Sequence, residues 1–264
     1  MVVFAAQGDP RRSMTLLWRP RPEPTRSAPG PKPALSVDGI VDAAVALADA
    51  EGMAAVSMRA IGDRLGRTGM ALYTYVPGKG ELVDLMYDRV HAELPTRYPT
   101  DAHWRVTVRA WAEDLWSCYL RHPWVLQVSQ ARPVLGPHEF TMLDTLVSIL
   151  RGTDLPPTPL RRISGTLVQF VRATAQTVAE TRQAPNATGM PDDEWWYARS
   201  GVLSEVAPDF ATRFPHVSWL ESEGAYQLDD PTVPYLEQEA RETFVAGLDA
   251  LLDGIEVAID RTAR

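Results

Sequence analysis

The 264-residue chain carries 26 Lys and Arg against 34 Asp and Glu, and 45% of its residues are hydrophobic. This composition is typical of a globular protein with an apolar core. Because the chain lacks a run of roughly 18 apolar residues, we expect no membrane-spanning helix. Its single cysteine, Cys118, excludes an intrachain disulfide and favours the cytoplasm.

Residues 1–33 are rich in Pro, Arg and Ser and lack helical periodicity, so we expect a disordered arm. Six of these residues are basic and two are acidic, whereas the remainder of the chain has an excess of acidic residues. Two interpretations stay open. The arm either follows DNA phosphates or enters a minor groove, or it is an unstructured leader that a translation start at Met14 would shorten.

From Ser36 onward the apolar residues recur every three or four positions, which is typical of amphipathic helices. A first helix is expected over 36–52, with Ser36 as its N-cap. Two short helices follow over 57–65 and 69–75, and only a tight glycine turn separates them. A longer helix then continues to about Leu94.

Two short helices joined by a tight turn and framed by longer helices predict a helix-turn-helix motif. In this motif the first short helix lies over the phosphate backbone and the second enters the major groove. Gly69, Met70 and Ala71 give the second helix a slim leading edge, and Leu72 and Val76 face the core. The polar groups that can reach bases or phosphates belong to Tyr73, Thr74, Tyr75 and Lys79. The alternative is that the two tyrosines are core aromatics of a small bundle.

The rest of the chain is predicted to be helical, with Pro or Gly in the connections. The expected helices lie at about 101–121, 123–130, 137–151, 158–184, 192–207 and 234–262. Residues 208–233 are expected to form a loop. The fold class is therefore all-α, with a three-helix DNA-binding domain at 34–80 and a larger helical domain for ligand binding and dimerisation at 81–264.

The sequence contains no nucleophile elbow, phosphate-binding loop, dinucleotide fingerprint, zinc-protease motif or paired-cysteine motif, so we expect no enzyme. Cys118 lies inside a predicted helix and is interpreted as a buried thiol. The five histidines form no recognisable ligand cluster, so neither a metal nor another cofactor is expected.

Residues 56–82, VSMRAIGDRLGRTGMALYTYVPGKGEL, resemble without a gap the DNA-binding signature of the TetR family of transcriptional regulators. The matching features are Leu65-Gly66, Leu72-Tyr73, Tyr75-Val76 and Lys79-Gly80-Glu81-Leu82. The resemblance implies that the helix crossing the backbone begins with Ser57, Met58 and Arg59. It also implies a groove-facing edge of Thr68, Gly69, Met70 and Ala71, and backbone contacts from Tyr73, Thr74, Tyr75 and Lys79.

Two positions, Gly78 and Gly80, depart from the family pattern. Gly69 and Met70 offer no strong hydrogen-bond donor at the predicted leading edge. We therefore expect base recognition to depend on apolar contacts with thymine methyl groups and on DNA shape.

Residues 119–137 and 244–259 resemble the C-terminal domain of the tetracycline-repressor branch of this family. The resemblance implies a ligand cavity and a homodimer interface of four helices, two from each subunit, which by position are 158–184 and 234–262. Both helices carry an apolar stripe, which fits either an interface or a core. Paired DNA half-sites require a two-fold dimer and favour the interface.

Eight tryptophans suggest a roomy aromatic region. Trp104 and Trp111 lie seven residues apart and share a helix face, either as core filler or as the wall of an effector pocket. The candidate effector-binding residues are Trp104, Trp111, Leu115, Gln169 and Arg172. The histidine pattern that binds magnesium-tetracycline is not evident, so tetracycline is not predicted.

The sequence therefore predicts a cytoplasmic, ligand-responsive DNA-binding regulator, a repressor that a small-molecule effector releases from a palindromic operator. The alternative is a DNA-binding or interaction module whose helical domain binds a partner protein and no metabolite. A closed aromatic pocket would favour the repressor, whereas a filled core with a broad exposed apolar patch would favour the interaction module.

Overall fold

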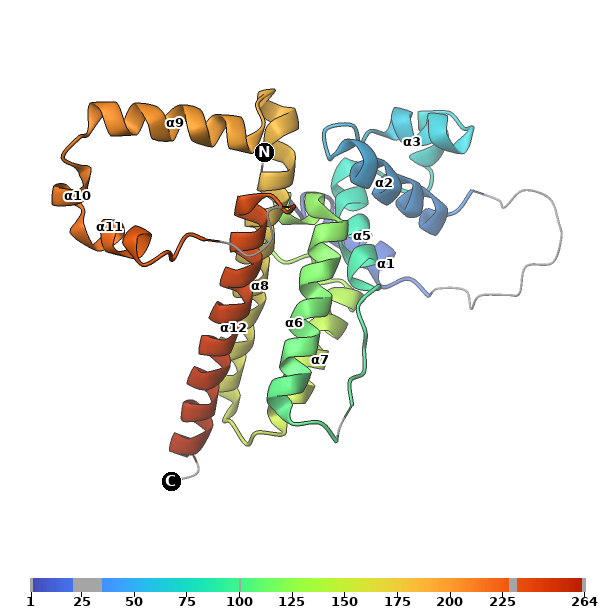
Figure 1. Cartoon of the computed structure of the whole chain (residues 1–264). Helices are drawn as coiled ribbons and strands as arrows, with labels where there is room; N and C mark the ends of the chain where they lie inside the picture. The colour runs from blue at the N-terminus through green and yellow to red at the C-terminus, as the bar shows by residue number, and fades with distance from the viewer. Residues whose placement is uncertain (1, 21–34, 100, 228–231, 263–264) are drawn as a thin grey trace. The chain divides into compact units, whose positions relative to one another are not determined.

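The computed structural model describes residues 2–20, 35–99, 101–227 and 232–262, and these are predominantly helical (Figure 1). The predicted all-α class is confirmed. The chain divides into two compact units, one of Met1–Arg172 with Leu252–Arg264 and one of Ala173–Leu251. None of the described helices is long and apolar enough to cross a membrane.

The first two helices after residue 35 begin and end as predicted. Helix α2 (Val37–Glu51) is capped by Ser36, whose hydroxyl accepts the Gly39 N–H at 3.1 Å. Helix α3 (Met58–Leu65) is capped by Ser57, which accepts the Ala60 N–H at 3.2 Å. Each side chain satisfies a backbone donor that the first helical turn leaves free.

Helix α4 (Gly69–Leu72) is shorter than the predicted 69–75, because the Tyr75 and Val76 N–H groups both turn back to the Leu72 carbonyl. Leu72 and Val76 are completely buried, as predicted. Helix α5 (Lys79–His91) follows and packs against α2. Ile40, Ile61 and Met86 complete the apolar centre of this bundle.

The first unit continues with α6 (Trp104–Arg121) and α7 (Pro137–Arg151), which pack against each other, and α7 also packs against α5. Between them lies a 3-10 helix, η1 (Pro123–Gln127), followed by the short strand β2 (Val128–Ser129). The helix predicted over 123–130 is therefore shorter than expected and of the 3-10 type, and the prediction is wrong for residues 128 and 129, which form the strand. An arginine side chain, described below, takes the carbonyl groups that a continuing α-helix would use.

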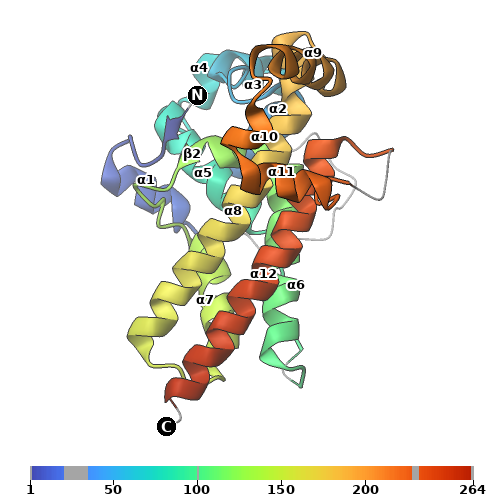
Figure 2. The same ribbon diagram turned by 60° about the vertical axis from the view of Figure 1, so that its left-hand side comes forward.

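Two long helices, α8 (Pro157–Thr188) and α12 (Tyr235–Thr262), each contribute residues to both units. Within each unit the segments of α8 and α12 that belong to it run side by side (Figures 1 and 2). Helix α8 passes through Pro185, where the sequence predicted its end. A proline so close to a C-terminus costs one backbone hydrogen bond without preventing the last turn. The Gly189 N–H closes that turn on the Pro185 carbonyl.

The second unit also contains α9 (Asp192–Val206), α10 (Phe210–Arg213) and α11 (Pro215–Ser222). The last two lie in the stretch predicted as loop, so that prediction is wrong for 210–213 and 215–222. Phe210 and Phe214 are four residues apart and their rings lie 4.9 Å from each other. Pro215 occupies the first helical position of α11, where its missing N–H costs nothing.

The N-terminal residues differ from the disordered arm that composition predicts. Residues 2–20 contain the strand β1 (Val3–Phe4) and the helix α1 (Pro10–Leu17), whose N-cap Asp9 accepts the Arg12 N–H at 2.9 Å. Ala5 and Leu17 are buried, which explains why this Pro- and Arg-rich segment is ordered. The part of the predicted arm over 21–33 lies outside the described residues.

Candidate functional site

The turn between α3 and α4 brings two helices together more closely than side chains would allow. A Cβ placed on Gly62 would lie 2.7 Å from the Arg67 carbonyl oxygen, and one on Gly69 would lie 3.1 Å from the Met58 carbonyl oxygen. Gly66 ends α3 in the left-handed conformation with φ of 65°. Glycine at these positions lets α4 cross α3 as a compact helix-turn-helix.

The free side of α4 presents large side chains to solvent. Met70 is 77% exposed, and Tyr73 and Tyr75 are 46% and 37% exposed. The two tyrosines are therefore not core aromatics of the bundle. An exposed apolar side chain and two exposed phenol side chains suit contact with thymine methyl groups and with phosphate oxygens.

The other predicted DNA-contacting residues fall into three groups. Ser57, Arg59, Thr68, Thr74 and Lys79 are exposed, and Ala71 is partly exposed. Met58 is buried at 7% exposure, so any contact it makes with DNA must use its backbone. Gly69 faces the α3 backbone, and its place in the motif allows close helix packing.

Exposed cations surround this motif although the chain as a whole is acidic. Arg59 has a side chain that is 92% exposed, and its ion pair with Asp63 is long at 4.0 Å. Arg64 and Arg67, which residue-type reasoning did not select, are also exposed beside the turn. Together with Lys79 they supply the positive charge that phosphate contacts need.

The predicted effector residues do not meet in one site. Trp111 and Leu115 are buried on α6, whereas Trp104 is partly exposed beside the Arg105 guanidinium. Gln169 is exposed on α8.

The guanidinium of Arg172 is engaged by the backbone of η1 and β2. It donates to the carbonyl oxygens of Val125 at 3.3 Å, Leu126 at 2.6 Å and Val128 at 2.7 Å. It also lies over the Tyr119 ring at 5.9 Å. These contacts bind α8 to the segment after α6 and leave few of the donors of Arg172 for a ligand.

A cluster of buried polar side chains lies where α5 and α6 face each other. The His91 ring packs on Tyr87 with centroids 4.5 Å apart, and its Nδ1 lies 2.8 Å from the Tyr87 carbonyl oxygen. His91 Nε2 and the Tyr119 hydroxyl are buried and make no hydrogen bond within the described residues. Burial lowers the pKa of His91 and raises the pKa of Tyr119. Unsatisfied buried polar atoms are uncommon and mark positions where a ligand or water would be held.

This cluster continues the predicted effector face of α6. Trp111, Leu115 and Tyr119 follow one another at four-residue spacing, so they share a buried side of the helix. Cys118 is buried as predicted, and this burial raises the pKa of its thiol to about 12. The spacing signal that singles out Tyr119 is present in the sequence, but its unpaired hydroxyl is visible only in the structure.

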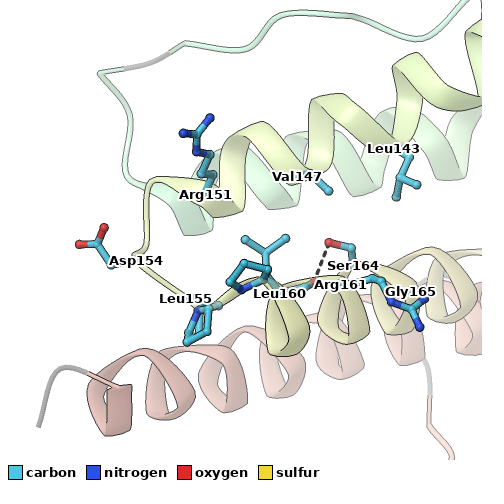
Figure 3. A pocket seen from close by; sticks show the side chains of 11 residues that line it. Leu143, Val147, Arg151, Asp154, Leu155, Leu160, Arg161, Ser164 and Gly165 are labelled. Atoms are coloured by element: carbon cyan, nitrogen blue, oxygen red, sulfur yellow. Dashed lines mark hydrogen bonds between the residues drawn. The ribbon is translucent and has the colours of Figure 1, made fainter.

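A separate open groove of about 680 Å³ lies between the end of α7 and the start of α8. In Figure 3, Leu143 and Val147 point from α7 toward α8, where Leu160 and Ser164 face them. The Ser164 hydroxyl donates to the Leu160 carbonyl oxygen, so it is already satisfied. None of the five predicted effector residues lines this groove.

A helix-turn-helix with exposed cations, followed by a larger helical body, defines the class of DNA-binding transcriptional regulators. Residues 40–86 match the model of the bacterial regulatory proteins of the tetR family, and residues 98–259 match the tetracyclin repressor-like C-terminal domain. The chain belongs to the TetR family of transcriptional regulators.

Among its relatives is DrrR1 of Streptomyces coeruleorubidus, an HTH-type transcriptional repressor that is 36% identical over 97% of this chain and 88% of DrrR1. The structure of apo ActR from Streptomyces coelicolor has a TM-score of 0.65 at 25% identity, covering 86% of this chain and 99% of ActR. ActR in complex with actinorhodin shares the fold with a TM-score of 0.64 at 24% identity, over 84% and 96% of the two chains.

Proposed function

We propose that this protein is a repressor that binds a palindromic operator as a homodimer and is released by a small-molecule effector. The observation that carries the proposal is that the exposed edge of α4 lies in a motif with four exposed cations, namely Arg59, Arg64, Arg67 and Lys79. The proposed DNA contacts are those of Ser57, Arg59, Thr68, Met70, Ala71, Tyr73, Thr74, Tyr75 and Lys79, with Met58 acting through its backbone and Gly69 through helix packing.

The domain assignment follows from the same proposal. The DNA-binding domain occupies 34–80, and the domain for effector binding and dimerisation occupies 81–264. Helices α8 and α12 are the proposed dimer helices. In the first unit Gly165 and Val257 are exposed on them, and in the second unit Val245 is exposed. Small and apolar exposed residues allow close helix pairing across a two-fold axis.

For the effector site we propose the buried side of α6 with its neighbour α5. Trp111 and Leu115 supply apolar surface, and the Tyr119 hydroxyl and His91 Nε2 supply unpaired polar groups. An aromatic small molecule with polar substituents matches this combination. ActR, which shares the fold, has been crystallised in complex with actinorhodin. In this proposal Trp104, Gln169 and Arg172 contact the effector only at the edge of the site.

We also propose that the protein acts in the cytoplasm and has no catalytic activity. Its family consists of transcriptional regulators. Within the described residues no group of three or more His, Cys, Asp or Glu side chains is arranged to hold a metal ion.

The test is selection of operator DNA by the purified full-length protein from sheared genomic fragments, followed by sequencing. Recovery of one or a few palindromic sites is the expected result. The double variant Y73A/K79A serves as the matched control and should recover none of them. If the unmodified protein enriches no sequence at moderate salt, either alone or after dialysis to remove bound effector, the operator-binding proposal is wrong.

A specific observation favours a second function, in which the helical domain binds a protein. Helices α9 to α11 expose a series of large apolar side chains, namely Trp195, Trp196, Tyr197, Val202, Leu203, Val206, Phe214, Val217, Trp219 and Leu220. Exposed apolar surface of this extent is unusual unless another surface covers it. Analytical ultracentrifugation compares W195A/W196A with the unmodified protein. If another copy of the chain covers this surface, the variant should show a lower oligomeric state.

A further inference from the structure

The N-terminal residues 2–20, which we call the strap, contact four parts of the first unit. At its beginning, β1 pairs in parallel with β2, with Val3 opposite Val128 and Phe4 opposite Ser129. Its helix α1 then packs against α5 (Figure 2). The strap thus joins the segment after α6 to the helix that directly follows the DNA-binding motif.

The middle of the strap is bound to α5 through its backbone. The Ala6 N–H donates to Asp84 Oδ1 at 2.8 Å, and Ala6 adopts the left-handed conformation with φ of 54°. A Cβ on Gly80 would lie only 3.2 Å from the backbone nitrogen of Gly8. Gly80 was a departure from the family pattern, and the close passage of the strap explains why glycine occupies this position.

The end of the strap reaches α7 and α2. Trp18 Nε1 donates to the Leu135 carbonyl oxygen at 3.0 Å, and the Trp18 ring lies 6.2 Å from the Phe140 ring. The Arg19 guanidinium forms an ion pair with Asp38 at the start of α2. The strap therefore contacts both sides of the junction between the DNA-binding helices and the helical body.

Two carboxylates one turn apart on α5 hold this junction. Asp84 accepts the Ala6 N–H of the strap, and Asp88 Oδ1 accepts the His138 and Glu139 N–H groups at the start of α7. Burial raises the pKa of Asp84, and the hydrogen bond from Ala6 opposes this shift. Loss of the Ala6 N–H would leave the buried Asp84 carboxylate without this donor, and an unpaired carboxylate in the core destabilises the fold.

We infer that the strap positions α5, and through it α4 and Lys79, for operator binding, with Asp84 as the positioning residue. Only a short turn separates α4 from α5, so a tilt of α5 moves the recognition helix. A dimer must engage two half-sites at a set spacing, and a helix that is held in place loses less conformational freedom on binding. This inference rests on the proposed operator binding.

The test compares D84A with D84N, because Asn keeps the oxygen that accepts the Ala6 N–H. A second variant, W18A, removes a contact at the surface and is not expected to threaten folding, since Trp18 is 52% exposed. Its matched control is Y226A, at an aromatic residue of similar exposure after α11, since Tyr226 is 46% exposed. A double variant, R11A/R12A, removes two exposed cations of the strap and none of the strap contacts described above.

Two readouts are needed, namely affinity for the selected operator over a salt series and hydrogen exchange of α5 amides without DNA. We expect D84A and W18A to lose about tenfold in affinity, within the usual range of coupling between sites, with an unchanged salt slope. Their α5 amides should exchange faster than those of the unmodified protein. D84N and Y226A should behave as the unmodified protein in both measurements.

Normal affinity and normal α5 exchange in W18A and in folded D84A would overturn the inference. A reduced salt slope in R11A/R12A, with D84A and W18A unaffected, would also overturn it and make the strap a DNA-contacting arm. If the unmodified protein binds no operator, the proposed function fails. The exchange measurement then still decides whether the strap holds α5.

Discussion

A Cβ placed on Gly62 of α3 would lie 2.9 Å from the backbone nitrogen of Gly69 at the start of α4. The two short helices of the DNA-binding motif therefore touch through their backbones. Real Cβ atoms do not approach a backbone nitrogen this closely, so a side chain at position 62 forces the helices apart. The orientation of the exposed α4 edge depends on this contact and on the close approach of Gly69 to the Met58 carbonyl group.

We expect G62A to reduce the free energy of unfolding by about 1–3 kcal/mol through overpacking and to abolish operator binding. Urea denaturation and fluorescence anisotropy measure the two effects. The control is G201A in α9, where an added Cβ meets no atom within 4 Å. There the loss of backbone freedom in the unfolded chain should raise stability by about 0.4–1 kcal/mol. Equal behaviour of the two variants would contradict the close-contact explanation.

Lys79 begins α5 directly after the recognition helix and has an exposed side chain. If it neutralises a phosphate, K79A should weaken binding to all DNA sequences alike and reduce the salt slope by about one. The measurement is the operator dissociation constant at several salt concentrations. R151A, which removes an exposed charge at the end of α7, is the control. A slope that R151A lowers as much as K79A does would argue against a specific phosphate contact.

Arg172 satisfies three backbone carbonyl groups in η1 and β2. Lysine cannot reproduce the planar fork of donors, so R172K should lower the free energy of unfolding by about 2–3 kcal/mol. Chemical denaturation measures this effect, with R162K at an exposed position of α8 as the control. An unchanged stability of R172K would mean that other donors reach these carbonyl groups.

The buried ring of His91 makes stability depend on pH. Burial lowers the pKa of His91 in the folded state, so the unfolded chain binds the proton more readily. The contribution of neutral His91 is therefore complete above the ordinary histidine pKa and is lost as the pH falls below it. Burial raises the pKa values of Asp84 and Glu139, which act in the opposite direction.

The comparison of the unmodified protein with H91Q isolates the histidine, because Gln keeps a donor for the Tyr87 carbonyl and does not titrate. Between about pH 8 and about pH 5.5 the unmodified protein should lose more unfolding free energy than H91Q. Urea denaturation across this range provides the measurement. Parallel pH profiles would show that His91 is accessible enough to protonate without unfolding.

The local pattern of residues was sufficient for the helix-turn-helix. Ser36 and Ser57 cap their helices as predicted, and Leu72 and Val76 are buried as the four-residue spacing required. The helix caps and the buried positions depend only on residues within one or two helical turns, so they can be predicted from the local sequence. The exposure of Tyr73 and Tyr75 was left open by the same pattern, because an aromatic residue fits both a core and a surface.

The proposed effector site shows the limit of such patterns. Trp111 was selected from its spacing to Trp104, but Tyr119 and His91 were not selected, because an unpaired buried polar atom is defined by what surrounds it. Arg172 was selected as a ligand contact, and the structure gives its donors to the backbone of a segment more than forty residues earlier in the chain.

The sequence by itself therefore determined the all-α class and the DNA-binding motif, since periodicity, caps and turn glycines are local properties. The resemblance of residues 56–82 to the TetR signature indicated the family. Only the tertiary structure decided that residues 2–20 form an ordered strand and helix. A strand of two residues and a helix of eight carry too little local signal. Their order comes from partners far along the chain, such as Asp84 and Val128, whose backbone and side-chain groups are brought within hydrogen-bonding distance only when the protein folds.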